Sequence, residues 1–360
     1  DEYIRAFHLA TEKERGFTDV KNMIDINFKP LKWSRSDGNI DLIKVELNEP
    51  ILPCTKQTFT FIYEVKIPDS KFTKYGYDNN GRIILKNWYL NPSRFEHKQF
   101  IKLSNENIDD IPNAFSDFDI EFELPSDYSL SSNLQEINIV NSSNTKTITL
   151  KANNKSEATL TIEPKNTFQN YKNEIIEVSC GIEDNRVNDI DKAVIFDKIS
   201  RFTAAKLGLP ISTKIIITQE DYSRQPFYGL NQLPSFLSPF SNNLIYELKF
   251  LKTYLNNYLK ENLNLNQRRD YWIYDGIQMF IMMQYVDEYY PDLKMTGNIA
   301  SLKILKSYHF INLSFNEQYS YLYMLMARIN LDQALNEPKN RLIKFNEQIA
   351  SKYRAGLSLK

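Results

Sequence analysis

The sequence predicts an α+β fold in which an antiparallel β domain precedes a mainly helical domain. Apolar and polar side chains alternate in one segment after another up to about residue 182, as they do in strands with one solvent-exposed face. Beyond residue 193 the spacing of apolar residues becomes helical. At 360 residues the chain is also too long for one ordinary domain. We therefore predict two domains, residues 1–185 and 186–360.

The first domain is predicted to be a series of antiparallel strands. Residues 40–47, 59–67 and 117–124 alternate most clearly, and turn-forming Pro, Asn and Gly residues separate them. Residues 141–153 are polar but still alternate at 147–150, which predicts a hairpin on an exposed edge of the sheet. A further strand is expected at 175–179.

The second domain is predicted to contain one short buried strand and several helices. The first helix spans residues 193–207 and ends at Gly208 and Pro210, both of which are typical of helix ends. A buried strand is expected at 214–218. The remaining helices are predicted at 242–263, 270–289, 297–307, 315–329 and 338–354.

Composition limits the class of protein. Hydrophobic residues make up 42% and charged residues 25% of the chain, as in soluble globular proteins. A formal net charge of −1 gives no electrostatic reason to expect nucleic acid or an anionic membrane as a partner. The longest apolar stretch, Ile277 to Val286, is too short to span a bilayer. Cys54 and Cys180 are compatible with one disulfide or with two free thiols.

Three segments of the second domain occur in the order found in a known catalytic core. They are Tyr228-Gly229-Leu230-Asn231-Gln232-Leu233-Pro234, Tyr246-Glu247-Leu248-Lys249-Phe250 and Trp272-Ile273-Tyr274-Asp275-Gly276. Their order resembles that of the M1 zinc aminopeptidases (gluzincins), in which a G-x-M-E-N strand is followed by an H-E-x-x-H helix and an N-E-G-like turn. The resemblance implies a saddle-like β-sandwich, followed by a mainly helical thermolysin-like domain. It also implies that parts of both family domains lie outside this sequence.

The residues that should hold zinc are replaced. A zinc peptidase uses two histidines one helical turn apart, a third carboxylate ligand and a glutamate base. The resemblance places Tyr246 and Phe250 at the histidine positions, Glu247 at the base and Asp275 at the third ligand. A phenol is a poor ligand at neutral pH, and a phenyl ring has no lone pair to donate. We therefore predict no zinc, no other cofactor and no catalytic residue, with Glu247 as a vestigial base.

These residues also have simple structural interpretations. Tyr246, Phe250, Tyr254 and Tyr258 recur every four residues, which favours an aromatic row packed in the core. Glu247 is expected to pair with an Arg or a Lys, and Asp275 to make a polar contact between the two helices of residues 242–263 and 270–289.

The segment from Tyr228 through Gly229, Leu230 and Asn231 to Gln232 is the candidate peptide-binding edge. In the family a glutamate of this segment binds the amino terminus of the substrate, and here the matching residue is the neutral Asn231. The strand edge can still pair with an extended peptide through backbone hydrogen bonds. A turn that only packs the two domains together is an equal alternative.

The resulting hypothesis is a catalytically inactive M1 peptidase-like protein, a pseudoenzyme that serves as a binding or scaffold subunit of a bacterial cell-envelope complex. The resemblance implies an exported protein, in the periplasm or associated with the outer membrane or cell surface. One alternative is an active metallo-aminopeptidase with an atypical metal site built from Glu247, Asp275 and His309. A second alternative is an extended-peptide-binding module that uses the Gly229–Gln232 edge.

Overall fold

The protein folds as two compact units, residues 1–111 and 112–360, in a computed structural model. The structure describes residues 9–36, 38–103, 108–228, 230, 238–301 and 309–360. The predicted boundary near residue 185 falls inside the second unit, at the point where strands give way to helices, and stays a prediction. Each unit is described by itself below.

The first unit consists of antiparallel strand pairs and short helical turns. β1 (Phe17–Asp25) pairs with β4 (Phe59–Lys66), and β2 (Lys32–Ser36) pairs with β3 (Asn39–Glu46). A small core of Val20, Met23 and Leu31 lies under these strands. The shorter elements are α2 (Ser70–Thr73), β5 (Gly76–Tyr77), β6 (Ile83–Leu85), β7 (Phe95–Glu96), β8 (Gln99–Phe100) and η1 (Ile108–Asp110).

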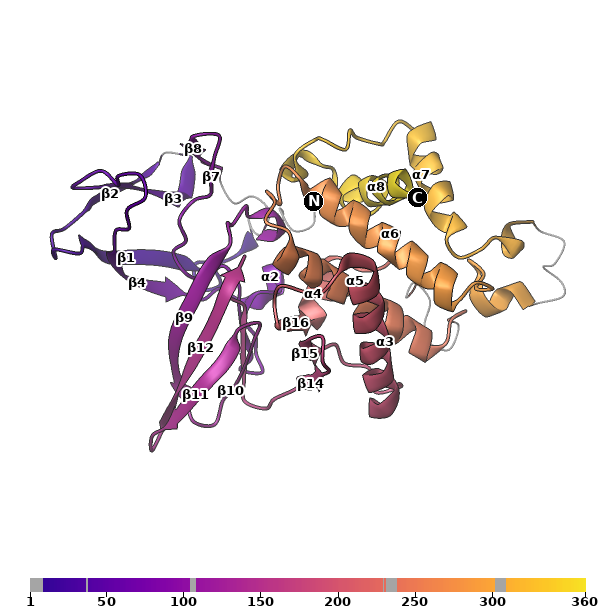
Figure 1. Ribbon diagram of the computed structural model, residues 1–360, viewed down its shortest axis with the longest axis horizontal. Helices are drawn as coiled ribbons and strands as arrows, with labels where there is room; N and C mark the ends of the chain where they lie inside the picture. Colours follow the sequence, from indigo (N-terminus) through magenta and orange to yellow (C-terminus); the bar gives the residue numbers. More distant parts are fainter. Residues whose placement is uncertain (1–8, 37, 104–107, 229, 231–237, 302–308) are drawn as a thin grey trace. The chain divides into compact units, whose positions relative to one another are not determined.

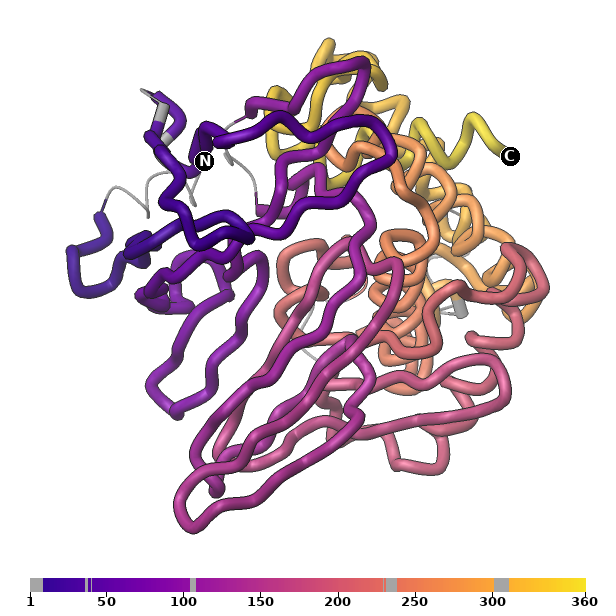
Figure 2. Tube along the Cα trace, turned by 60° about the vertical axis from the view of Figure 1, so that its left-hand side comes forward, coloured from indigo at the N-terminus to yellow at the C-terminus, as the bar shows by residue number. Residues whose placement is uncertain are grey.

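The second unit opens with a three-stranded antiparallel sheet. β12 (Thr145–Lys155) lies between β9 (Ser116–Pro125) and β11 (Gln135–Asn141), and Figures 1 and 2 show the three strands extending side by side. β11 and β12 form the predicted hairpin. Among the described residues β11 pairs with β12 alone, and it exposes Ile137, Ile139 and Val140. A short pair, β10 (Ser129–Ser132) with β13 (Leu160–Glu163), follows the same antiparallel pattern.

A βαβ unit connects the strands to the helices. β15 (Glu177–Gly181) is antiparallel to β14 (Gln169–Lys172) and parallel to β16 (Lys214–Thr218). The crossover between the parallel strands is α3 (Asp189–Leu207), which the sequence predicts at 193–207. Its N-cap Asn188 accepts a hydrogen bond from the backbone N–H of Asp191 at 2.8 Å. The short helix α4 (Gln219–Arg224) follows β16.

The helical part is built around α5 (Asn242–Asn262) and α6 (Tyr271–Tyr289), which match the predicted helices closely. α7 (Glu317–Arg328) also matches its prediction, and η5 (His309–Asn312) precedes it. Of the helix predicted at 297–307, the 3-10 helix η3 (Gly297–Ser301) is described and residues 302–307 lie outside the described part. The helix predicted at 338–354 is divided into η6 (Lys339–Arg341), the π-helix η7 (Asn346–Ala350) and α8 (Ser351–Leu359).

Glycines allow α6 and α8 to pack closely. A Cβ atom at Gly276 would lie 3.2 Å from Ala355 Cβ, and one at Gly356 would lie 2.6 Å from Met279 Cβ. Real Cβ atoms avoid the shorter of these distances. This close approach brings the first turn of α8 next to the first turns of α6.

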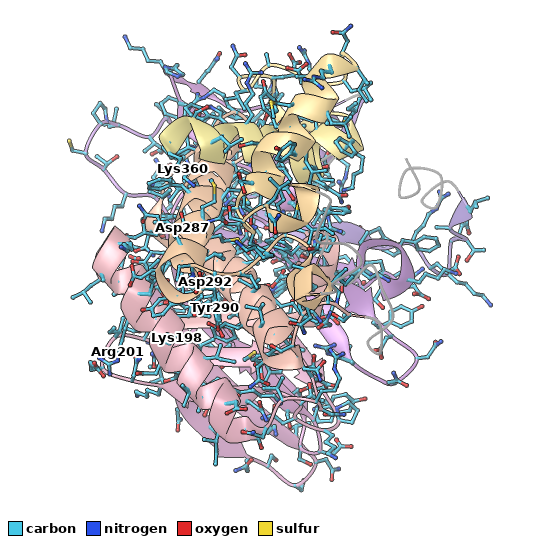
Figure 3. The ribbon with its side chains drawn as sticks, turned by 90° about the vertical axis from the view of Figure 1, so that its right-hand side faces the viewer. Lys198, Arg201, Asp287, Tyr290, Asp292 and Lys360 are labelled. Carbon is cyan, nitrogen blue, oxygen red and sulfur yellow. The ribbon has the colours of Figure 1, made fainter. Side chains whose placement is uncertain are left out.

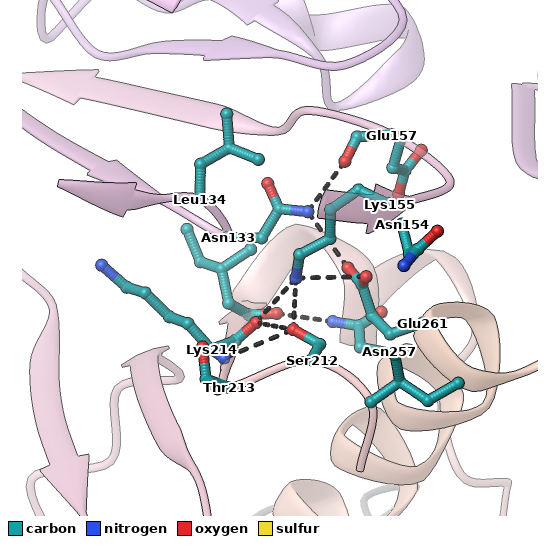
Figure 4. A network of polar contacts seen from close by, with 12 residues as sticks. Asn133, Leu134, Asn154, Lys155, Glu157, Ser212, Thr213, Lys214, Asn257 and Glu261 are labelled. Carbon is teal, nitrogen blue, oxygen red and sulfur yellow. Dashed lines mark hydrogen bonds and ion pairs between the residues drawn. The ribbon is translucent and has the colours of Figure 1, made fainter. Parts of the chain in front are cut away.

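A buried polar network joins strands and helices within the second unit (Figure 4). Lys155 at the end of β12 forms an ion pair of 3.1 Å with Glu261 in the last turn of α5, and its Nζ also donates to the carbonyl oxygen of Lys214 at 2.9 Å. Asn133 donates to Glu261 at 3.1 Å. Burial raises the pKa of Glu261 and lowers the pKa of Lys155.

Two further observations bear on the sequence predictions. No helix within the described ranges is both long enough and apolar enough to cross a membrane. Both cysteines are free thiols; Cys54 is exposed and Cys180 is buried.

Candidate functional site

The aromatic row on α5 lies in the core. Ser241 caps the helix by accepting a hydrogen bond from the Leu244 N–H at 3.3 Å, which fixes where the helical repeat begins. The rings of Tyr246, Phe250, Tyr254 and Tyr258 then follow one another with centroids 6.3, 6.0 and 5.9 Å apart. All four side chains are buried, as their spacing predicts.

Tyr246 faces the sheet in a setting that disfavours its charged form. Its hydroxyl lies 3.8 Å from Cys180 Sγ on β15. Burial raises the pKa of Tyr246 far above its usual value near 10, and the Cys180 and Tyr171 side chains add to the rise. A phenol kept neutral in this way does not supply the phenolate that a metal ion needs.

Glu247 points to a different set of groups. It is 3% exposed, forms an ion pair with Lys198 of α3, and accepts hydrogen bonds from Tyr285 and, at 2.6 Å, from Tyr290. Figure 3 shows Lys198 and Tyr290 close together on one side of the helical part. Lys198 also lies over the Tyr289 ring, 5.0 Å from its centroid.

Both oxygens of the Glu247 carboxylate are therefore engaged by donors. The expected Lys pairing is present, but the carboxylate is buried and is also bonded to two tyrosines. A base that activates water needs an oxygen directed at the water, and neither oxygen of Glu247 is free for this role.

Asp275 pairs with α8 rather than with α5. Its Oδ1 lies 3.3 Å from Lys352 Nζ, whereas its Oδ2 is buried and has no hydrogen-bond partner. Lys352 also donates a hydrogen bond to Gln225 Oε1 at 2.9 Å. The predicted contact across the two helices is thus replaced by one to a third helix, made possible by the close approach of Gly356 to α6.

The structure separates the carboxylates that the resemblance aligns with one metal site. Tyr285, which binds Glu247, lies ten residues beyond Asp275 on α6, about 15 Å along the helix axis. No three His, Cys, Asp or Glu side chains within the described part of the chain are grouped to hold a metal ion. Of the atypical site, η5 contains the backbone of His309, and its side chain lies outside the described residues. Tyr246, Phe250 and Asp275 do not form a donor set that fits zinc.

The candidate peptide-binding edge is described only in part. Gly229, Asn231 and Gln232 lie outside the described residues, so their proposed role stays a prediction. Leu230 is buried, and the hydroxyl of Tyr228 donates to Gln348 of η7.

Sequence reasoning missed two buried lysines beside Asp275. Lys252 and Lys352 are 5% and 2% exposed, and both interact electrostatically with each other and with Asp275. One signal could have revealed Lys252: α5 is apolar on almost all sides in its middle turns, so a lysine there is unusual.

Comparisons with known proteins give the fold. No family model matches the chain, and no curated protein matches it. An M1 zinc metallopeptidase from Deinococcus radiodurans matches with a TM-score of 0.53 at 12% identity. A mutant of an M1 zinc metallopeptidase from that organism, bound to a Tyr-Ser-Ala substrate, matches with a TM-score of 0.55 at 13% identity. Each match covers 95% of this chain and 72% of the other.

The chain therefore has the two-domain fold of the M1 metallopeptidases. The predicted α+β class, with an antiparallel β-rich first part and a helical second part, is confirmed. At these identities the likeness concerns the fold alone.

Proposed function

We propose that this protein is a pseudopeptidase, an M1-like scaffold that binds no zinc, cleaves no peptide and serves as a binding or scaffold subunit. The supporting observation is the packing at the positions aligned with the zinc ligands. Tyr246 and Phe250 fill the core with fully buried rings, and Glu247 is held by Lys198, Tyr285 and Tyr290. A metal site here would require new ligands and the loss of these contacts.

Metal content and turnover test the enzymatic part of the proposal. The protein is purified without chelator, its zinc is measured by mass spectrometry, and hydrolysis of aminoacyl substrates is assayed with added zinc. We expect zinc well below one per chain and no turnover above that of an Asp184→Asn control. One zinc per chain, together with turnover abolished by Glu247→Gln, would overturn the proposal and establish the active aminopeptidase.

The second part of the proposal is a stable protein partner in a bacterial cell-envelope assembly, with the chain exported to the periplasm or the outer surface. It rests on the resemblance alone. Cross-linking in intact cells followed by fractionation should find the chain in the envelope, in a complex of fixed stoichiometry. A cytoplasmic monomer would contradict this part and leave the metal result untouched.

Peptide binding is the second candidate function. The observation that favours it is the buried group of charged and polar side chains around Asp275, which contains donors and acceptors without partners.

A further inference from the structure

A cluster of four side chains lies where α5, α6 and α8 meet in the second unit. We call Lys252, Asp275, Gln278 and Lys352 the lysine cluster. Gln278 Nε2 donates to the backbone carbonyl oxygen of Lys252 at 2.8 Å, which places the amide beside α5. Asp275 and Gln278 are three residues apart on α6 and so share a face. Lys352 reaches Asp275 from α8.

The lysine cluster has an excess of buried positive charge. It contains two ammonium groups and one carboxylate, and none of these residues is more than 7% exposed. Lys352 is compensated by Asp275 and Gln225. Lys252 Nζ makes no hydrogen bond or ion pair with any residue in the described part of the chain, and the nearest aromatic ring, Phe227, has its centroid 5.9 Å away. An unpaired buried charge is costly unless an opposite charge joins it.

Two acceptors in the same cluster also have no partner. Asp275 Oδ2 and Gln278 Oε1 are buried and accept no hydrogen bond. Native proteins pair nearly all such atoms, so each exception points to a missing group. One unpartnered cation and two unpartnered acceptors within one cluster require a group that is negatively charged and also carries an N–H or O–H.

We propose that the lysine cluster binds the carboxyl terminus of a peptide, with its carboxylate on Lys252 and its last amide N–H on Asp275 Oδ2 or Gln278 Oε1. The single negative charge of a peptide terminus balances the excess charge of the cluster. A free amino terminus would add to that excess, and a zwitterionic amino acid would leave it unchanged. The inference rests on the proposed function, in which the chain holds a peptide without cleaving it.

Calorimetric titration with two matched peptides tests the inference. The first probe is N-acetyl-Ala-Ala-Ala with a free carboxyl terminus, and the second is the same peptide with a carboxyl-terminal amide. We expect the free acid to bind at least tenfold more tightly than the amide. Equal binding of the two peptides, or no binding of either, would overturn the assignment.

Variants on α5 assign the effect to the cluster. Lys252→Met should bind acid and amide equally, whereas Lys260→Met, about 12 Å further along the same helix, should keep the preference for the acid. Circular dichroism and the melting temperature show that both variants are folded. A preference that survives in Lys252→Met would refute the role of Lys252.

Two further arms separate related outcomes. Sodium acetate that competes as strongly as the acid peptide would assign the site to small free carboxylates and refute peptide recognition. The acetylated probe has no free amino terminus and is therefore not a substrate for an aminopeptidase. Its binding can be measured whether the chain proves to be inactive or active, so a failure of this inference is distinguishable from a failure of the proposed function.

Discussion

Lys352 of α8 lies 3.3 Å from Asp275 of α6, the residue at the position of the family's third zinc ligand. A carboxylate that would face a metal ion instead faces a cation supplied by the chain itself. Glu247 is paired with Lys198 in the same way, at a separate point on α5. The positions aligned with one metal site thus contribute to two independent interior ion pairs.

Replacing Lys352 should be strongly destabilising. Lys352→Met leaves the buried Asp275 carboxylate without a cation, and breaking a buried pair from one side costs about 3–5 kcal/mol. Chemical denaturation should show this as a lower midpoint. The double variant Lys352→Met with Asp275→Asn should recover part of the loss, and a double variant as unstable as the single one would argue against a direct pair.

Replacing Lys252 should have the opposite sign near neutral pH. Burial, reinforced by the charge of Lys352, lowers the pKa of Lys252 from 10.5 to about 7. Because the unfolded chain keeps the higher pKa, unfolding takes up a proton between these two values, and stability rises with pH across that range. Lys252→Met lacks this dependence. It should be more stable than the natural protein at pH 6.5, by a margin that shrinks at pH 9.

The free energy of unfolding of both proteins, measured at pH 6.5 and pH 9, decides this point. A margin that is the same at the two pH values would mean that Lys252 does not titrate as described.

Restoring the two histidines should not restore zinc. In Tyr246→His with Phe250→His, two imidazoles replace packed rings, while Asp275 stays paired with Lys352 and Glu247 with Lys198. The chain loses core packing, for which Phe→Ala sets an upper scale of about 3–5 kcal/mol. Mass spectrometry after dialysis should find zinc below one per chain. Stoichiometric zinc would show that a third ligand is within reach.

The two helix-packing glycines should differ in their tolerance of alanine. A Cβ at Gly356 would lie 2.6 Å from Met279 Cβ, whereas a Cβ at Gly276 would lie 3.2 Å from Ala355 Cβ. Gly356→Ala should therefore be destabilising by about 1–3 kcal/mol through overpacking. In Gly276→Ala the better helix propensity of alanine, about 1 kcal/mol, offsets a milder clash. Thermal melts of the two variants give the comparison, and equal losses would contradict it.

Local patterns were sufficient to predict most of the secondary structure. The strand predicted at 214–218 is β16, and the helix predicted at 242–263 is α5 to within one residue at its end. The aromatic row was predictable because its four residues lie on one helix and share one spacing.

The site was harder to predict because its contacts join distant segments. Nothing near Asp275 in the sequence indicates that Lys352 will reach it, since that contact depends on how closely α8 packs on α6. The same holds for Glu247, whose partners come from α3 and from the end of α6. Sequence spacing identified which side chains replace the zinc ligands, and tertiary packing decided what those side chains do.

The two thiols provide a direct readout of the core around Tyr246. Cys54 is exposed, whereas Cys180 is buried against the Tyr246 hydroxyl, and burial raises the pKa of the Cys180 thiol. A thiol reagent should therefore modify one cysteine at once in the native protein and the second only when the sheet and α5 come apart. The rate of the second modification measures how often this part of the interior opens, with no label introduced by mutation.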